Sequence, residues 1–524
     1  MSSCYAKTRS TRAWKGKGRA IDPANYRLVR RADPITSPAG EDGVVLPLTM
    51  IQATSYATIY TLPIQIGTSS HNQTLSVQVD SGSSDLWVAS KACGSNACKQ
   101  TGGNLYDPTY ATPTGMNFRI TYVEGDAIGP IVWDQVDIGG YTVDTQAIAA
   151  ASTVDDEPLS TDFSGVLGIA LPANSVIAGC VPPTTGNAPD GAVFASNLFS
   201  MTPSSTAPSS RFLSLTLARP EDNGGGTKSQ LGIGKHPPEI VKDPSKVQYD
   251  NLANPSLTVP YFWQALLSGI SVWVDGVEKV VDIGKSAKSP GSPPTAIVDS
   301  GMPVILTSRD VANALYGALG IGPGNDGQYY ISCTQPLNMS VKLDGRTSIP
   351  LHPLDLTVGA AGNCMGMIQA YPAGSSVADV GDVILGVPFM RSVYTVMAYD
   401  TPDVQGVFPN ASQTRGAFSH PKLGLLGLTE PGKALDEFHT VRVLNQPLTT
   451  GSSQSTGGGS SGGGGSSGGS SGKAEKSEGK KLSVGLEVLI GIVGFFVLCF
   501  VLFGVRWAVH RRKIEGREGR EGSM

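Results

Sequence analysis

The sequence is poor in charged residues and in histidine, and its cysteines show no metal-binding spacing. Only 16% of the 524 residues are charged, six are histidine, and the formal net charge is −4. A chain with so little basic charge lacks the electrostatic footprint of a nucleic-acid-binding protein. Neither RNA-recognition spacing nor zinc-site spacing occurs in it. We therefore expect no nucleic-acid partner and no bound metal.

A second absence concerns the N-terminus, where no apolar run of signal-peptide length precedes Val44. We therefore expect the true N-terminus to be missing or misassigned. The first 31 residues are instead rich in Lys and Arg, and Asp22 is the only acid among them. One interpretation of such a segment is a disordered basic tail.

Glycine, proline and apolar residues are abundant. The chain has 65 Gly and 36 Pro, and 40% of its residues are hydrophobic. This composition suits short strands and turns around sizeable cores better than it suits helices. From Tyr56 onward, apolar and polar residues alternate in short runs, for example in residues 75–80. We therefore expect an all-β protein with more than one domain.

Two short acidic motifs stand at matching places in the two halves of the chain. Asp80 ends an apolar run and precedes Ser-Gly-Ser, and Asp299 ends a second run and precedes Ser-Gly. An apolar-apolar-Gly triplet begins 86 residues after the first acid, at 166–168, and 85 residues after the second, at 384–386. One copy alone would be ordinary turn chemistry. The matched offsets instead indicate an internal duplication that contributes one acid from each half.

These motifs resemble the pepsin family of aspartic endopeptidases, over about residues 55 to 430. The resemblance implies a bilobal, pepsin-like, all-β fold, with an N-terminal lobe over 46–235 and a C-terminal lobe over 236–430. It also implies two aspartates that share one proton and activate a water molecule, without a metal or organic cofactor. The residues that it assigns to the catalytic pair and its supporting loops are Asp80, Asp299, Ser81, Gly82, Ser83, Ser300 and Gly301.

Residues 118–140 are predicted to form a hairpin with Gly125 near its tip. This hairpin resembles the flap that folds over bound substrate in the family. The resemblance makes Tyr122 the flap tyrosine and Trp87 its partner, whose indole N–H donates to the tyrosine hydroxyl. It places Phe163 beside the substrate side chain that precedes the scissile bond. Simple core packing is the alternative interpretation of these aromatic residues.

Several residues depart from the family pattern. Gln78 stands where the relatives usually have an apolar residue, and Val123, Glu124 and Asp126 replace a small, neutral flap tip. An acid over the cleft either favours basic substrates or simply faces solvent. Met302 stands where relatives have a Ser or Thr that donates to the aspartate, and methionine has no donor. We therefore expect weaker activity than in the relatives. We also expect the pair of aspartates to keep its shared proton to a higher pH than in the relatives.

Seven cysteines and three glycosylation sequons bear on the compartment. Cys93 with Cys98, and Cys333 with Cys364, match disulfides of the family, which implies an oxidising compartment. The remaining cysteines, which we expect to be free thiols, are Cys4, Cys180 and Cys499. The Asn-X-Ser/Thr sequons, which are candidate glycosylation sites, begin at Asn72, Asn338 and Asn410.

The family resemblance gives the basic N-terminus a second interpretation. In relatives of pepsin a basic prosegment covers the acidic cleft until it is removed. Residues 1–45 are therefore either propeptide-like or a basic tail, and Arg30-Arg31 is typical of a dibasic processing site.

The C-terminal part changes composition twice. Residues 431–481 are expected to be a linker, because 451–472 are almost wholly Gly and Ser. Residues 482–505 are apolar, with Glu487 as their only charge, and are long enough to cross a bilayer. The basic tail that follows, 506–524, favours a cytosolic C-terminus. We expect a single-pass type I membrane protein whose lobes face the cell surface or the secretory or vacuolar lumen.

We therefore expect a membrane-anchored aspartic endopeptidase that cleaves peptide or protein substrates at acid pH and is monomeric. It should prefer a hydrophobic residue beside the scissile bond. The alternative from another class is a pepsin-fold binding protein that has lost catalysis, which Met302 and the altered flap tip favour. A third alternative takes the missing signal peptide literally. It makes the chain a cytosolic, tail-anchored protein in which Cys93 and Cys98 are free thiols.

Overall fold

The structure is a computed structural model that describes residues 2–3, 39–122, 125–181, 192–222, 226–253, 259–287, 289, 291–359, 362–372, 381–410 and 420–448. The chain divides into two compact units, 1–453 and 454–524, and all the described residues belong to the first. Within these described ranges, no helix is long and apolar enough to cross a bilayer. The expected membrane span at 482–505 lies outside them.

Strands dominate the described residues, as the composition predicts, and this content fits a bilobal pepsin-like fold. The largest sheet has the order β1-β7-β8-β9-β6-β11-β5-β4-β3, with β10 paired to β8. Its strands are β1 (Ser2–Ser3), β3 (Thr49–Gln52), β4 (Thr58–Ile66), β5 (Gln73–Asp80), β6 (Leu86–Ala89), β7 (Thr112–Thr121), β8 (Asp126–Ile138), β9 (Tyr141–Ala151), β10 (Thr153–Asp155) and β11 (Gly165–Gly168). This sheet carries the first acid motif and the predicted flap.

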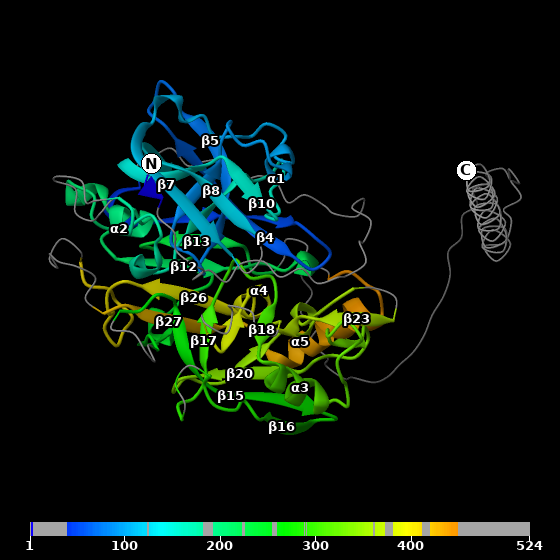
Figure 1. Ribbon diagram of the computed structural model, residues 1–524. Coiled ribbons are helices and arrows are strands. Elements are labelled where there is room, and N and C mark those ends of the chain that lie inside the picture. The colour runs from blue at the N-terminus through cyan, green and yellow to red at the C-terminus, as the bar shows by residue number, and fades with distance from the viewer. Residues whose placement is uncertain are drawn as a thin grey trace, which may run out of the picture. The chain divides into compact units, whose positions relative to one another are not determined.

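A second sheet combines strands from both halves of the chain, in the order β14-β27-β26-β12-β13-β2. Its strands are β2 (Val44–Pro47), β12 (Phe212–Thr216), β13 (Gln230–Ile233), β14 (Gln248–Asn251), β26 (Val393–Ala398) and β27 (Lys422–Gly427). The antiparallel pair of β12 and β26 joins the two halves in register from Phe212 opposite Ala398 onward (Figure 1). The two halves therefore share backbone hydrogen bonds.

The third sheet carries the second acid motif, in the order β21-β20-β15-β17-β25-β18-β24, with β16 paired to β15. Its strands are β15 (Gln264–Val274), β16 (Val277–Val281), β17 (Thr295–Val298), β18 (Ile305–Thr307), β20 (Met339–Leu343), β21 (Ile349–Leu351), β24 (Ile368–Ala370) and β25 (Val383–Leu385). A small sheet of β19 (Tyr330–Ser332), β23 (Asn363–Gly366) and β22 (Thr357–Val358) lies in the same half. The α-helices are short: α1 (Asn96–Lys99), α2 (Phe194–Leu198), α3 (Arg309–Gly317), α4 (Val387–Met390) and α5 (Pro431–Phe438).

Local sequence explains the tight connections between paired strands. β8 and β9 are joined at Gly139-Gly140, and β15 and β16 at Asp275-Gly276, and all four of these residues have positive φ. Two consecutive residues with positive φ form the turn whose twist matches that of an antiparallel hairpin, which is why Gly-Gly and Asp-Gly occupy it.

The C-terminal boundary of the second half differs from the expectation that a linker begins at 431. Residues 431–438 form α5, and the Glu430 side chain accepts hydrogen bonds from the first turn of this helix. Ala434 and Phe438 are buried, and Arg442 donates to the carbonyl oxygens of Thr357 and Gly359 over 2.9 and 3.0 Å. The segment folds because its apolar face covers the second half, and Pro431 at the start of α5 is compatible with a helix N-terminus.

Candidate active site

Each predicted catalytic acid stands at the end of a buried strand. Asp80 is the last residue of β5, and Asp299 directly follows β17. Both side chains are fully buried. The backbone N–H of Gly82 donates to Asp80 Oδ1 over 2.9 Å, and that of Gly301 donates to Asp299 Oδ1 over 2.8 Å. The small residues after each acid thus bring a backbone donor onto the carboxylate.

The serines that follow the acids tie the two loops together. The N–H of Ser81 donates to Ser300 Oγ over 3.0 Å, and the N–H of Ser300 donates to Ser81 Oγ over 2.9 Å. Each hydroxyl then donates across the pair: Ser81 Oγ to the carbonyl of Val298 over 3.0 Å, and Ser300 Oγ to that of Val79 over 2.9 Å. The two loops therefore exchange the same set of bonds, as expected of a duplicated structure.

Gly301 shows how closely the two carboxylates approach each other. A Cβ placed on Gly301 would lie 2.3 Å from Asp80 Oδ1 and 3.2 Å from Asp299 Oδ1. The two oxygens are therefore separated by no more than the sum of these distances. Only glycine fits there, since a Cβ would collide with the Asp80 carboxylate. Two carboxylates this close share a site in which both do not readily carry a negative charge.

The apolar-apolar-Gly triplets lie against the acid loops in both halves. β11 runs parallel to β5, with Gly168 opposite Asp80, and β25 runs parallel to β17. A Cβ on Gly168 would lie 2.6 Å from the backbone N of Ser84, and one on Gly386 would lie 2.3 Å from the carbonyl oxygen of Met302. Each glycine thus lets a strand pass directly under the loop that holds an acid.

The predicted flap is the hairpin of β7 and β8. Its turn is closed by a hydrogen bond from the Tyr122 N–H to the Gly125 carbonyl over 2.9 Å, and Gly125 has φ 96°. The indole Nε1–H of Trp87 donates to the Tyr122 hydroxyl over 2.7 Å, which is the predicted contact. Phe163 is buried in the same apolar cluster as these two rings. Val123 and Glu124 at the flap tip lie outside the described residues.

Asp126, the remaining acid of the predicted flap tip, is engaged by its own hairpin. The Thr121 hydroxyl donates to Asp126 Oδ1, and an Arg119 guanidinium nitrogen lies 3.8 Å from Asp126 Oδ2. Its carboxylate thus contacts two side chains of its own hairpin instead of facing solvent alone.

Met302 takes the place that Ser83 occupies in the first loop. The Ser83 hydroxyl donates to Asp80 Oδ2, whereas the Met302 side chain is fully buried in an apolar cluster with Tyr56, Met365 and Met367. The two acid loops are therefore equivalent in backbone geometry but differ in this side-chain donor.

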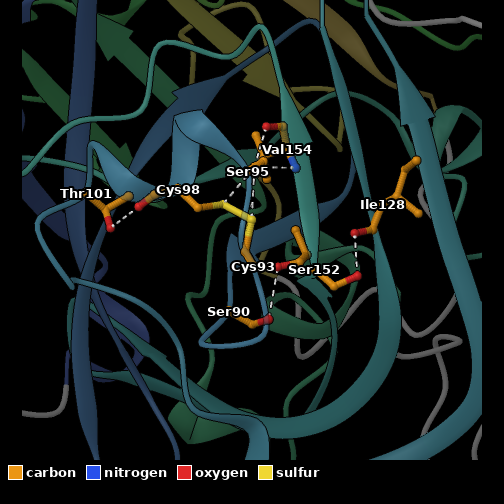
Figure 2. Close-up of a disulfide and its surroundings, with 9 residues drawn as sticks. Ser90, Cys93, Ser95, Cys98, Thr101, Ile128, Ser152 and Val154 are labelled. Atoms are coloured by element: carbon orange, nitrogen blue, oxygen red, sulfur yellow. Dashed lines mark hydrogen bonds between the residues drawn. A yellow bond between two sulfur atoms is a disulfide. The ribbon is translucent and has the colours of Figure 1, made fainter.

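Both expected disulfides are present. Cys93–Cys98 closes a small loop before and within α1, and Cys333–Cys364 joins the segment after β19 to β23. Ser95, inside the first loop, makes two hydrogen bonds to the backbone of Val154 on β10 (Figure 2). Its hydroxyl donates to the Val154 carbonyl over 2.7 Å and accepts from the Val154 N–H over 3.2 Å. The disulfide loop is thereby held against β10, which pairs with the flap strand β8.

The other predicted modification and thiol sites are spread over the surface. Cys180 is half-buried and forms no disulfide among the described residues, and its Sγ donates to the Val176 carbonyl over 3.2 Å. Cys4 and Cys499 lie outside the described residues. Asn72 and Asn410 are exposed, and Asn338 is half-buried. Within the described ranges, no cluster of three or more His, Cys, Asp or Glu side chains is arranged to hold a metal ion.

Asp85, in the first acid loop, was not singled out in the sequence. Its buried carboxylate accepts hydrogen bonds from the N–H groups of Val176 and Ile177 over 2.8 and 3.2 Å, and from the Ser175 hydroxyl. It therefore holds the segment after β11 against the loop of Asp80. The sequence shows that Asp85 follows Asp80 by five residues. Its hydrogen-bond partners, however, are some 90 residues away, and no sequence motif predicts that pairing.

Comparisons with known proteins agree with this geometry. The family model for eukaryotic aspartyl proteases matches residues 59–215 and 244–406. Major aspartyl peptidase 1 of Cryptococcus neoformans is 27% identical over 369 residues, which are 65% of this chain and 66% of that protein. Cathepsin E of Mus musculus is 32% identical over 274 residues, 52% of this chain and 59% of that protein. Rhizopuspepsin-1 of Rhizopus niveus is 27% identical over 338 residues, which are 63% of this chain and 74% of that protein. The chain thus spans slightly less than two thirds of the first two relatives.

Proposed function

Because the chain belongs to the family of eukaryotic aspartyl proteases, we propose that it is an endopeptidase that hydrolyses peptide bonds at acid pH, using Asp80 and Asp299. The observation that carries this proposal is the approach of both carboxylates to Gly301, which the exchange between Ser81 and Ser300 maintains. A binding protein would not need two acids held at one point.

The reaction follows from the protonation state of this pair. One carboxylate is ionised and takes a proton from a water molecule as that water attacks the peptide carbonyl. The other carboxyl is protonated, hydrogen-bonds the carbonyl oxygen and stabilises the charge that develops on it. The nitrogen of the scissile bond receives a proton when the tetrahedral intermediate collapses. The proton belongs to the pair and is not assigned to either residue.

The surrounding residues orient these groups and exclude solvent. The N–H groups of Gly82 and Gly301 fix the inner oxygens of the acids. The hairpin of Tyr122 closes over an extended peptide, and the bond from Trp87 sets the position of the tyrosine. Opening of this hairpin admits the substrate and its closure positions it.

The test is cleavage of an acid-denatured protein substrate by the purified full-length chain. We expect cleavage at acid pH, block by a statine-type inhibitor, and loss of cleavage in Asp80→Asn. Asp107→Asn, which changes an acid that pairs with the exposed Lys91, should cleave like the native chain. Lack of cleavage by the native protein, or cleavage retained in Asp80→Asn, would instead favour the pepsin-fold binding protein.

We also propose that residues 482–505 hold the protein in a membrane with its lobes outside the cytosol, and that 451–472 form a flexible tether. The apolar run and the basic residues after it support this proposal. Deletion of 482–505 should release the protein from membranes washed in alkaline carbonate. Release of the undeleted chain by the same wash would contradict it. The propeptide role of 1–45, the glycans and the monomeric state stay predictions.

A further inference from the structure

This inference rests on the proposed function and concerns Gln78, which lies two residues before Asp80 in β5. On this strand Val77 and Val79 point into the main core. Because side chains alternate along a strand, Gln78 points to the opposite face, the same one as Asp80. Its side chain is 1% exposed, and its Oε1 has no hydrogen-bond partner among the described residues. A buried acceptor without a donor destabilises the fold, and a ligand that donates to it would compensate for that cost.

The face that carries Gln78 also carries the residues of the flap cluster. Gln78 is opposite Val166 on β11, and Val166 is opposite Trp87 on β6. The three therefore form a row across neighbouring strands, each about 4.8 Å from the next. Trp87 holds the flap residue Tyr122, and Val166, Trp87, Tyr122 and Phe163 pack in one cluster. Gln78 thus lies on the same face of the sheet as Asp80, in one row with Val166 and Trp87 of the aromatic cluster.

A buried carboxylate lies at the turn of the same flap. Glu157 is 3% exposed, and its Oε1 is 2.9 Å from the position that a Cβ on Gly125 would occupy. It is carried by the loop after β10, whose last residue, Asp155, is opposite Asp126 at the base of the flap turn. A buried carboxyl group therefore lies against the flap turn, at the residue whose carbonyl accepts from the Tyr122 N–H.

We propose that Gln78 and Glu157 select a substrate with a basic residue, lysine or arginine, beside the scissile bond. The long apolar stem of such a side chain packs on Val166, Phe163 and Tyr122, as charged side chains commonly do on apolar surface. Its charged end donates to Gln78 Oε1 and pairs with Glu157. Like the catalytic acid Asp80, which is also fully buried, Gln78 meets substrate only after the flap opens. The chain therefore differs from the hydrophobic preference that the family resemblance implied.

The experiment compares kcat/KM for peptides that differ only at the residue before the scissile bond. This residue is lysine, arginine, norleucine, which has the lysine stem without its nitrogen, or leucine. We expect the native full-length chain to favour lysine or arginine over norleucine by about tenfold or more, because the charged end gains a hydrogen bond and a counter-charge. Lysine and arginine together separate a general charge preference from one that needs the planar guanidinium.

Three variants locate the source of that preference. Gln78→Leu, which keeps the volume but removes the acceptor, and Glu157→Gln, which removes the charge, should each lower the lysine-to-norleucine ratio by about tenfold. Asp126→Asn removes an acid that is already engaged by its own hairpin and should leave the ratio unchanged. Equal effects of all three variants would mean that general acidity near the flap, rather than Gln78 and Glu157, sets the preference, and would overturn the inference.

Failure of the inference and failure of the proposed function give different results. Cleavage of the norleucine and leucine peptides with no preference for lysine or arginine would overturn this inference alone, and this outcome needs only the native protein. A native preference that survives in both Gln78→Leu and Glu157→Gln would also overturn it. Absence of cleavage of every peptide would overturn the proposed function, and the inference with it.

Discussion

At the scale of single residues, Met302 makes the two acid loops chemically unequal. Ser83 donates to Asp80, whereas the Met302 side chain packs among Tyr56, Met365 and Met367. A donor to an ionised carboxylate stabilises its charge and is worth about 1.5 to 3 kcal/mol. In Met302→Thr we therefore expect the acid limb of the pH dependence of kcat/KM to move to lower pH by about one to two pH units.

Met302→Leu is the matched control for this prediction. It retains the apolar packing, removes no donor and should leave the pH profile in place. Because threonine fills less of the apolar cluster, Met302→Thr should also unfold more easily, by about 1 to 3 kcal/mol. Superimposable pH profiles of the native chain and Met302→Thr would show that the missing donor has no effect on the pair.

His236 makes stability depend on pH. It stacks on Phe212 with ring centroids 4.5 Å apart, and its Nδ1 lies 2.6 Å from the Tyr394 hydroxyl. Burial lowers the pKa of His236 from 6.5 to about 4. The unfolded chain therefore binds a proton below pH 6.5 that the folded chain does not bind until near pH 4. The contribution of neutral His236 to the free energy of unfolding is therefore complete above pH 6.5. It falls by at most about 3 kcal/mol between pH 6.5 and pH 4.

Replacement of this histidine by phenylalanine tests that account. In His236→Phe the ring stacking is retained and the titrating group is lost, so the fall in the free energy of unfolding between pH 7 and pH 4 should be smaller than in the native chain. Urea unfolding at both pH values measures it. His71→Phe, at an exposed position, should keep the native fall. The account fails if His236→Phe loses as much stability as the native chain.

At the scale of elements, the close passage of β11 and β25 under the acid loops requires glycine. In Gly168→Ala the new Cβ would meet the backbone of Ser83, Ser84 and Asp85 at 2.7 Å or less. We expect a loss of about 1 to 3 kcal/mol of stability from overpacking. Activity should fall further, since the displaced loop carries Asp80. Gly179→Ala, whose Cβ would have its nearest contact at 3.5 Å, is the control and should change neither.

The elements that sequence could predict are those with a local signal. The alternation before Asp80 and before Asp299 is visible in a few residues, and the strands and acid loops form there. The Trp87–Tyr122 bond and both disulfides followed from the family resemblance. Helix α5 was not predicted, because the linker expected from the Gly- and Ser-rich residues 451–472 was begun at 431, whereas Ala434 and Phe438 of this helix are buried. Such tertiary packing leaves no mark in the local pattern.

At the scale of the whole molecule, a buried group of charges connects the two halves. Asp355 accepts from Arg219 Nε over 2.6 Å and from Arg391 Nη1 over 3.3 Å. Arg391 Nε also donates to the Tyr60 hydroxyl over 2.7 Å, and that hydroxyl donates to the Ala218 carbonyl over 2.6 Å. Tyr60 and Arg219 come from the first half, and Asp355 and Arg391 from the second. The bonds between the halves join residues that are 136 and 331 positions apart, so no sequence spacing predicts them.

Removing the shared carboxylate should destabilise the whole molecule. In Asp355→Asn the largely buried guanidinium groups of Arg219 and Arg391 lose the carboxylate that they share. Among the described residues, Arg219 then retains only the longer ion pair with Asp222, at 3.8 Å. We expect a loss of about 3 to 5 kcal/mol in the free energy of unfolding. Lys91→Met, which breaks a surface ion pair with Asp107, should change stability little, because Lys91 is mostly exposed. Denaturant unfolding of both variants measures this. Equal stabilities of Asp355→Asn and the native chain would show that the group does not join the halves.

The central claim is that Asp80 and Asp299 act as one catalytic unit. The most direct measurement is kcat/KM at acid pH for the native chain, Asp80→Asn, Asp299→Asn and the double variant. Residues that act as a unit have strongly non-additive effects, so each single variant should lose about a thousandfold or more and the double variant should be no worse than either. A single variant that stays within about tenfold of the native chain would contradict the account.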